Sequence, residues 1–188
     1  MTPAHEFNLG LQGWLWSRPH IRGHKRPKVV LVAMKEEVEH ELFPAVPGIP
    51  RSIRNHRIAA IERELDGAEV TRFQVEDYGF RHALAVWERH PDADAYVCLS
   101  DQIAVGLKHL LLCRGCSEDE CRERIVGCDG SALAREAKIA SLSQGLEEVG
   151  KSALDRLCIL LDQYEGREFT FPQEAEEIPV TVRLVEYY

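Results

Sequence analysis

The sequence contains no long hydrophobic run. Its apolar stretches fall short of the roughly eighteen residues that a membrane-spanning helix needs. The first residues, MTPAHEFNLGLQGWLW, also lack the basic segment followed by an apolar segment that marks a secretory signal. These two absences predict a cytoplasmic protein without a membrane partner.

Catalytic motifs are missing as well. The chain holds no G-x-S-x-G, no phosphate-binding loop, no G-x-G-x-x-G and no H-E-x-x-H. Eight histidines are present, but none stands beside a nucleophile signature. His82, His90 and His109 fall on or next to predicted helices, and we interpret them as surface residues. We therefore predict that the chain is not an enzyme and needs no cofactor; an enzyme is the third hypothesis, and no substrate is nominated for it.

Positive charge is scarce. The chain has 23 Lys and Arg against 31 Asp and Glu, a net charge of −8, so the domain as a whole does not attract DNA phosphates. One basic stretch, RPHIRGHKRPK at 18–28, departs from this balance. We interpret it as the solvated cationic end of a helix, which favours the helix dipole. A nucleic-acid contact is the alternative interpretation.

The six cysteines are predicted to be reduced thiols, because the chain shows no export signal. Cys98 and Cys158 lie among apolar neighbours and are interpreted as core residues. The segment CRGCSEDEC, 113–121, followed by Cys128, is more suggestive of a metal. Zinc needs about four converging ligands, and the usual second close pair is missing. We predict thiols scattered around a helix end and no metal, with a metal site as the alternative.

Alternating strands and helices dominate the remaining pattern. Short apolar, β-branched runs predict strands at 28–34, 68–73, 93–100 and 123–129. Helical periodicity predicts helices at 55–67, 77–89 and 102–113, the second capped by Asp77 and burying Phe80, Leu84 and Trp87. This order predicts an α/β fold, a parallel sheet with helices on both faces. Beyond residue 138 the sequence predicts a strand at 138–143, a long amphipathic helix near 147–164 and a closing strand at 178–188.

Polar residues follow two of these strands where they end. Ser100 and Asp101 stand between the third strand and the next helix, and Asp129 ends the fourth strand. One of the first pair is expected to accept hydrogen bonds from the free N–H groups of the helix. The carboxyl edge of a parallel sheet is also where such folds bind ligands, and carboxylates accept bonds from hydroxyl-rich molecules.

With these residues in place, the sequence resembles the effector-binding region of LacI/GalR-type transcriptional regulators. Six segments carry the resemblance in order along the chain: HIRGHKRPKVVLVA (20–33), NHRIAAIEREL (55–65), DADAYVCLSDQIAVGLKHLL (92–111), ERIVGCDGSALA (123–134), KIASLSQGLEEVGKSALDRLCILL (138–161) and EIPVTVRLVEYY (177–188). Each motif is modest, but six in register make coincidence improbable.

The resemblance implies a fold like that of type I periplasmic-binding proteins. Residues 1–140 would form the C-terminal lobe, and 141–188 would supply a helix and strand belonging to the N-terminal lobe. The helix-turn-helix headpiece and the first part of the N-terminal lobe have no counterpart. The implied function is sensing a small polar metabolite, a sugar or a purine-like molecule, in a homodimer that contacts operator DNA through the missing headpiece. A stand-alone sugar-binding module is the alternative.

Site residues carried over from the resemblance lie at positions where the family contacts its ligand: Arg57, Ser100, Asp101 and Asp129. Arg57 is otherwise an ordinary exposed helix residue, and Asp101 is in part a helix cap. The family stacks an aromatic side chain on the sugar from the loop after the second strand. Gln74 falls at that place here, with Phe73 nearby. No metal ligand is implied.

Overall fold

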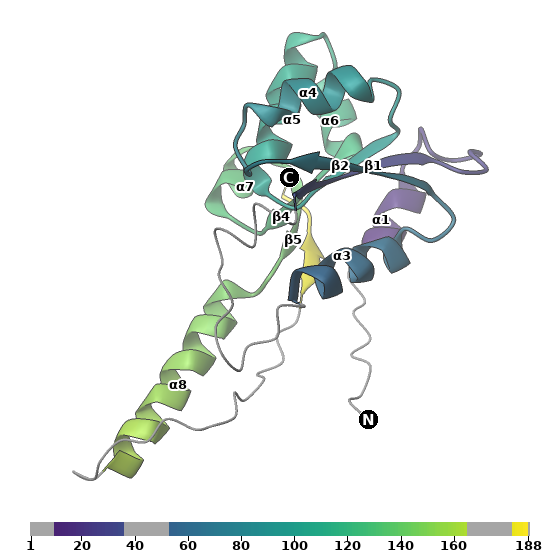
Figure 1. Cartoon of the computed structure of the whole chain (residues 1–188). Coiled ribbons are helices and arrows are strands. Elements are labelled where there is room, and N and C mark those ends of the chain that lie inside the picture. Colours follow the sequence, from purple (N-terminus) through teal and green to yellow (C-terminus); the bar gives the residue numbers. More distant parts are fainter. Residues whose placement is uncertain (1–9, 36–52, 165–181, 188) are drawn as a thin grey trace.

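A single six-stranded sheet organises the molecule (Figure 1). The computed structural model describes residues 10–35, 53–164 and 182–187, and the side chains of 53–57, 163 and 164 are not described. The strand order is β2-β1-β3-β4-β5-β6. The strands are β1 (Lys28–Met34), β2 (Glu69–Val75), β3 (Ala95–Cys98), β4 (Ile125–Asp129), β5 (Ala140–Ser143) and β6 (Arg183–Val185). The first five are parallel and β6 is antiparallel to β5, which confirms the predicted α/β fold.

The central strands are apolar along nearly their whole length because helices cover both faces. Every residue of β1 after Lys28 is buried, and all four residues of β3 are buried. The edge strand β2 is mostly exposed, as an edge position with one neighbour permits. Parallel strands buried on both sides require such continuous hydrophobic runs.

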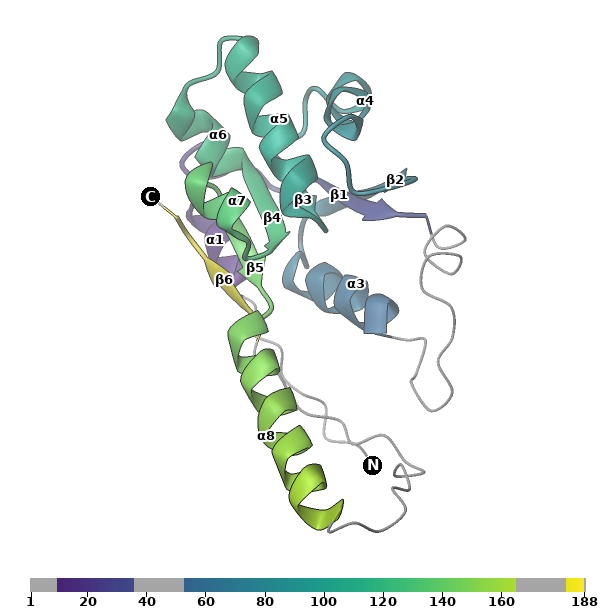
Figure 2. The same ribbon diagram turned by 90° about the vertical axis from the view of Figure 1, so that its left-hand side faces the viewer.

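Helices form a layer on each face of the sheet (Figures 1 and 2). One face carries α1 (Leu11–Ser17) and α3 (Ile53–Glu64), whose buried residues include Trp14, Leu15 and Ile61. The other face carries α4 (His82–Arg89), α5 (Asp101–Cys113), α6 (Glu118–Arg124) and α7 (Ala132–Glu136). The prediction of helices on both faces is confirmed; α1, α6 and α7 were not predicted.

Helix α4 differs from its prediction in both its start and its buried face. It begins at His82, five residues later than predicted, and its buried residues are Ala83 and Val86. Phe80 and Leu84 are 48% and 45% exposed. The reason is close packing on α5: a Cβ added at Gly106 would lie 3.1 Å from the Cβ of Ala83. Small residues at this contact leave no room for large side chains, which turn outward.

The strand predicted at 123–129 is two residues shorter, because its start belongs to α6. Ser117 and Glu120 form a capping box: the Ser117 hydroxyl accepts from the Glu120 N–H, and the Glu120 carboxylate accepts from the Ser117 N–H. These two bonds begin a helix that extends to Arg124. The apolar residues Ile125 and Val126 then enter the sheet.

The C-terminal part consists of β5, the long helix α8 (Leu146–Tyr164) and β6. Figures 1 and 2 show α8 projecting away from the sheet. The described part of the closing strand pairs with β5, with Leu142 opposite Leu184. The division into lobes at 1–140 and 141–188 stays a prediction, with β6 lying in the same sheet as β1–β5.

The cysteines of the metal alternative lie on different sides of the sheet. Cys121 is buried in the layer of α4–α7, while Cys128 belongs to the core under α1 and α3. Cys113 is exposed at the end of α5. The interpretation of Cys158 as a core residue is wrong, because it is exposed on α8, while Cys98 is buried as expected. Over residues 10–35, 53–164 and 182–187, no group of three or more His, Cys, Asp or Glu side chains is placed to hold a metal ion. The separation arises because successive side chains of a strand point to opposite faces, and that of Cys128 in β4 points to the face opposite the one that α6 covers.

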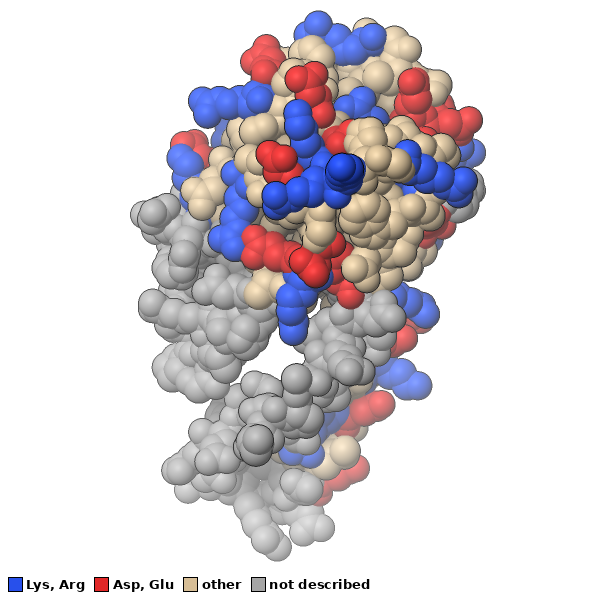
Figure 3. Space-filling model, turned by 90° about the vertical axis from the view of Figure 1, so that its right-hand side faces the viewer, with Lys and Arg blue, Asp and Glu red and all other residues tan. Residues whose placement is uncertain are grey.

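The basic stretch at 18–28 is interleaved with acidic partners. The guanidinium of Arg18 donates to the carbonyl of Trp14 at 3.0 Å, at the end of α1, and pairs with Glu186 at 2.8 Å. The ring nitrogens of His20 and His24 lie 3.5 and 3.4 Å from Glu123 and Asp94. On the face drawn in Figure 3, basic and acidic side chains of the described residues are intermixed. These contacts agree with the interpretation of the stretch as a cationic helix end. Within the described ranges, no helix is long and apolar enough to cross a membrane.

Candidate functional site

The candidate site lies at the carboxyl edge of the sheet, where β3 gives way to α5. Ser100 has extended backbone and serves as the N-cap of α5: its hydroxyl accepts from the Gln102 N–H at 3.1 Å. The same hydroxyl donates to the carbonyl of Tyr78 at 3.4 Å. The expected capping role is therefore confirmed, and it ties α5 to the loop after β2.

Asp101 is enclosed by the protein. Asp101 is 2% exposed, and its two carboxylate oxygens accept hydrogen bonds from Ser131, which follows β4, and from Ser141, which lies within β5. The Oδ2 atom accepts from the Ser131 N–H at 2.8 Å and from the Ser131 hydroxyl at 2.6 Å. The Oδ1 atom accepts from the Ser141 hydroxyl at 2.6 Å. Such charge-assisted bonds give Asp101 a structural position, in which it holds the segments after β4 and within β5 against α5.

Gly127 makes this arrangement sterically attainable. A Cβ added at Gly127, in β4, would lie 2.1 Å from the Oδ1 atom of Asp101 and 3.2 Å from its Cα. Only a residue without a side chain lets α5 approach the strand closely enough for the carboxylate to reach Ser141.

Asp129 ends β4 in an unusual backbone conformation, with φ of 128°. Positive φ is uncommon for a residue with a side chain, and strained positions of this kind cluster at ligand-binding and active sites. Its Oδ1 atom accepts from the Gln144 amide at 2.8 Å. The following Gly130 also has positive φ, 66°, and a Cβ there would lie 2.6 Å from the Ser143 hydroxyl. A half-buried carboxylate and an amide thus meet at the ends of β4 and β5.

The structure brings three of the predicted site residues together at one edge and places two others, Phe73 and Gln74, on the distant strand β2. Ser100, Asp101 and Asp129 lie at the ends of the neighbouring strands β3 and β4. Arg57 lies in the first half of α3, which begins at this same edge because it connects two parallel strands. Its side chain is outside the described part of the chain.

Phe73 and Gln74 lie on β2, which is separated from β4 by β1 and β3, a distance of about 14 Å at the usual strand spacing. The Phe73 ring packs edge-on against His90, with centroids 5.9 Å apart, inside the layer of α4. Gln74 is exposed on this edge strand. The structure therefore places neither side chain beside Asp129.

A cluster of ionisable groups follows β2 on the same edge. The Asp77 carboxylate accepts from the Gly79 N–H at 2.8 Å and pairs with Arg81 and His82, the latter at 3.0 Å. The bond from Gly79 is the main cause that holds the pKa of Asp77 below its ordinary value, and the neighbouring Arg81 and His82 lower this pKa further. Asp77, predicted as a helix cap, instead closes a turn before α4.

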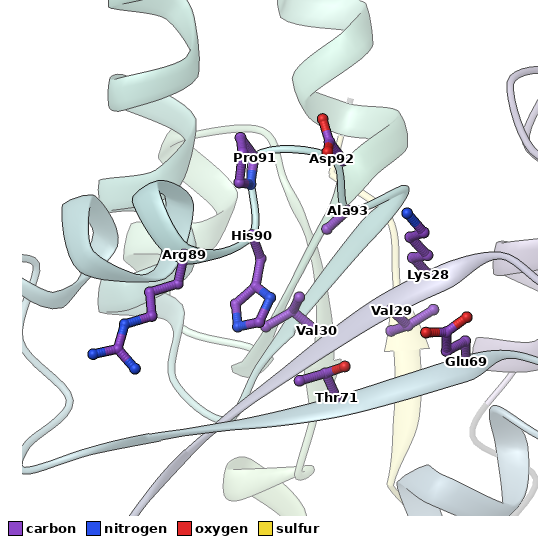
Figure 4. Close-up of a pocket in the computed structure, with 10 residues that line it drawn as sticks. All are labelled: Lys28, Val29, Val30, Glu69, Thr71, Arg89, His90, Pro91, Asp92 and Ala93. Carbon is purple, nitrogen blue, oxygen red and sulfur yellow. The ribbon is translucent and has the colours of Figure 1, made fainter.

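A described cavity of about 260 Å³ lies at the opposite, amino edge of the sheet (Figure 4). It is formed by the first residues of β1 and β2 and by the loop between α4 and β3, including Lys28, Glu69, His90 and Asp92. Apart from the imidazole, the charged side chains that line the cavity are two basic ones, Lys28 and Arg89, and two acidic ones, Glu69 and Asp92. The cavity is thus distinct from the edge that carries Ser100 and Asp129.

This fold is shared with solved structures of LacI family transcriptional regulators and of periplasmic solute-binding proteins. Three solved structures illustrate the likeness. A LacI family transcriptional regulator from Arthrobacter sp. FB24 in complex with lactose is 21% identical, with a TM-score of 0.54 over 76% of this chain and 52% of that one. A LacI family regulator from Bifidobacterium animalis subsp. lactis is 21% identical, with a TM-score of 0.56 over 93% and 59%.

The third is an ABC transporter periplasmic solute-binding protein from Actinobacillus succinogenes with bound D-allose, 16% identical, with a TM-score of 0.54 over 94% of this chain and 59% of that one. The likeness establishes the fold, and the chain spans between 52% and 59% of the length of these structures. No family model and no curated protein matches the sequence.

Gln144, Ser131 and Ser141 were not predicted as parts of this edge. The signal that identified Asp101 and Asp129 was a polar residue directly after a predicted strand. Ser143 and Gln144 likewise end the apolar run at 138–143, so the same signal at this third strand end would have identified Gln144. The partners of Asp101 lie 30 and 40 residues away in sequence, and no local pattern indicates them.

Proposed function

We propose that this chain is the effector-binding region of a LacI/GalR-type transcriptional regulator that senses a small polar metabolite, a sugar or a purine-like molecule. One observation carries the proposal: Asp129, whose backbone is strained, accepts a hydrogen bond from Gln144 at the carboxyl edge of the sheet, the edge that also carries Ser100. The fold of this sheet is shared with sugar-bound proteins. Open α/β sheets bind ligands at this edge.

The proposed ligand contacts divide the edge into two roles. Asp129 would accept hydrogen bonds from ligand hydroxyl or amino groups, and Gln144 could both accept and donate them. Arg57 would be a further donor to the ligand. Asp101 would position them, because it holds Ser131, two residues beyond Asp129. Ser100 is buried and would act indirectly: its hydroxyl would fix the start of α5 by capping it and the loop after β2 by its bond to the Tyr78 carbonyl.

In the proposed regulator, effector binding would change how two chains are held together. This change would alter operator binding through a headpiece outside this sequence, as a coupling between two binding equilibria. The protein would work in the cytoplasm. Residues 1–140 would form one lobe, α8 would belong to the second, and β6 stays in the sheet that it joins.

A stand-alone solute-binding module is the second candidate. It is favoured by the match to periplasmic solute-binding proteins, whose TM-scores are 0.54 and, for one from Burkholderia multivorans, 0.58, against 0.53 to 0.56 for the regulators. The two candidates differ in the gene directly upstream of this sequence. A helix-turn-helix coding segment there would support the regulator, and a cleavable leader would support the solute receptor.

Ligand-dependent stabilisation tests the shared part of both proposals. The melting temperature is measured in the presence of lactose, D-allose, glucose 6-phosphate or adenine, each at a concentration far above its Kd. At about 100 times Kd, binding adds about 2.7 kcal/mol to stability, which is a shift of several degrees. We expect one of the four to raise the melting temperature.

The matched variants are Asp129→Asn, which removes a charge at the proposed site, and Asp92→Asn, which removes one at the opposite edge. The shift should disappear in the first variant and persist in the second. If all four compounds leave wild type and both variants unchanged, or if Asp129→Asn keeps a full response, the proposed site is wrong.

A further inference from the structure

Cys116 lies between two helices, and the end of the first one fixes its position. Helix α5 ends in a Schellman motif: the Cys116 N–H donates to the Leu111 carbonyl at 3.1 Å, and the Gly115 N–H donates to the Leu112 carbonyl at 3.0 Å. Gly115 has the positive φ, 92°, that this motif requires. The residue after the glycine commonly packs its side chain back on the last turn of the helix. Cys116 accordingly packs, partly buried, against the core covered by α4–α7.

Helix α6 begins directly afterwards, and its start places a second cysteine next to the first. Ser117 is the N-cap of the capping box, so Cys116 holds the position before the cap and Cys121 the fourth position of the helix. Side chains at these two positions commonly pack against each other, in the contact known as a hydrophobic staple. In this chain both members of the staple are thiols.

Contacts with α5 place the two cysteines on the same side of that helix, beside which α6 lies (Figure 2). The Cys121 thiol donates to the Lys108 carbonyl at 3.9 Å, and the Cys116 N–H bonds to Leu111, one turn further along α5. Cys121 and Leu111 belong to one packed cluster, and Cys116 packs against it. These contacts bring the two thiols to neighbouring positions beside α5.

Solvent reaches one of the two thiols and not the other. Cys116 is half-buried, while Cys121 is 0% exposed. Burial is the main cause that raises the pKa of Cys121 to about 11, and the neighbouring Cys116 raises it further, so Cys121 is protonated at neutral pH. The reactive form of cysteine is the thiolate. A small oxidant in solution therefore meets Cys116 first, with Cys121 behind it.

We propose that Cys116 and Cys121 are a modification site, at which hydrogen peroxide closes a reversible disulfide. The proposal does not depend on ligand binding at the carboxyl edge. In the first step the Cys116 thiolate attacks a peroxide oxygen; the O–O bond breaks, hydroxide leaves and takes up the proton that Cys116 gave up, and Cys116 becomes a sulfenic acid.

In the second step the Cys121 sulfur attacks the sulfenic sulfur of Cys116 and the S–S bond forms. The S–O bond breaks, and the departing hydroxide takes up the Cys121 proton and leaves as water. The two thiols together lose two electrons, and one peroxide is reduced to two waters. A thiol that returns the two electrons, such as dithiothreitol, reopens the bridge.

Cys113 is the competing partner, because it lies three residues before Cys116 and is exposed. It is the last residue of α5, and its side chain is in solvent where that of Cys116 packs inward. A bridge between these two would pull Cys116 off Leu111 and out of the staple. The packing therefore favours Cys121 as the partner.

Peptide mass spectrometry on the full 188-residue chain tests the proposal. The reduced protein is treated with hydrogen peroxide, unfolded, alkylated with iodoacetamide and digested with trypsin. The tryptic peptide GCSEDECR (115–122) carries both cysteines of the pair, while HLLLCR (109–114) carries Cys113. After oxidation, GCSEDECR should be lighter by two hydrogen atoms and carry no alkyl group. Dithiothreitol before alkylation should restore two alkylated thiols.

Three variants separate the roles of the thiols. Cys113→Ser is the matched control and should form the bridge as wild type does. Cys121→Ala should stop at the sulfenic acid, so dimedone labelling of Cys116 should rise at least about tenfold over wild type, in which the neighbouring thiol consumes this intermediate. Cys116→Ser should leave Cys121 unoxidised in the folded protein. Circular dichroism checks that each variant is folded.

The proposal is overturned if GCSEDECR keeps two alkylated thiols at every peroxide concentration, or if Cys116 is found joined to Cys113. It is also overturned if Cys113→Ser prevents the bridge, or if dimedone labels Cys116 equally in wild type and in folded Cys121→Ala. Where a buried substitution unfolds the chain, the peptide masses of wild type and Cys113→Ser decide, since Cys113 is exposed.

Discussion

The contact between Gly127 and Asp101 gives the sharpest prediction about this fold. In Gly127→Ala, the new methyl group would lie 2.1 Å from the Oδ1 atom of Asp101, so the carboxylate must rotate away. The rotation breaks the 2.6 Å bond from Ser141 and disturbs the two bonds from Ser131. Overpacking costs about 1–3 kcal/mol, and the lost bonds to a charged group add to it, so we expect a loss of about 3 kcal/mol or more.

Asp101→Ala should cost about 3–5 kcal/mol. It leaves the Ser131 N–H without an acceptor inside the protein and removes the acceptor of two hydroxyls. Breaking a buried, hydrogen-bonded charge from its partners falls in this range. The double variant should cost about as much as Asp101→Ala alone, because the methyl group at 127 no longer meets an oxygen. The coupling energy between the two sites is thus expected to be about 2 kcal/mol or more.

Urea unfolding followed by tryptophan fluorescence measures these losses. With a slope near 2 kcal/mol per molar, Gly127→Ala should lower the midpoint by about 1.5 M. Gly13→Ala in α1, where an added Cβ meets nothing within 4 Å, is the matched control and should be neutral or slightly stabilising. If Gly127→Ala behaves like this control, or if the losses of the two single variants add fully, the role assigned to Asp101 is refuted.

Three other predictions concern the helix cap and the thiols. Ser100→Ala removes the N-cap of α5 and should cost about 1 kcal/mol in the same urea assay; a loss below about 0.3 kcal/mol would contradict the cap. Cys113 and Cys158 should react rapidly with a thiol reagent and Cys98 only on unfolding, because burial raises the pKa of its thiol well above the ordinary value. Burial also raises the pKa of Cys121 to about 11. The stability that the protein gains from this buried, uncharged thiol should be complete below about pH 9 and decline toward pH 11, because the unfolded thiol ionises in that range while the folded one does not. Cys121→Ala should therefore reduce the alkaline loss of stability, and an unchanged loss would contradict the assignment.

The main strands could be read from the sequence because burial on both faces imposes a continuous apolar run. The prediction of a strand at 28–34 matches β1 to the residue. Errors arose where side chains and not periodicity fix an element. The start of α4 depends on the turn closed by Asp77, and the start of β4 depends on the capping box at Ser117.

The candidate site was predictable only in outline. Ser100 and Asp129 were identified because strand ends of a parallel sheet share one edge, and the structure places both there. The expected aromatic contribution of Phe73 stays a prediction; β2 lies three strand spacings from β4, a separation that strand order decides and local sequence does not.

The sequence by itself determined the class of fold, the position of the strands and the cap at Ser100, since each depends on residues that are neighbours along the chain. Tertiary structure alone decided the environment of Asp101, whose partners Ser131 and Ser141 come from distant segments. It also decided the strained backbone of Asp129 and the pairing with Gln144. Long-range packing sets these features, because a carboxylate in the interior is stable only where other segments bring donors to it.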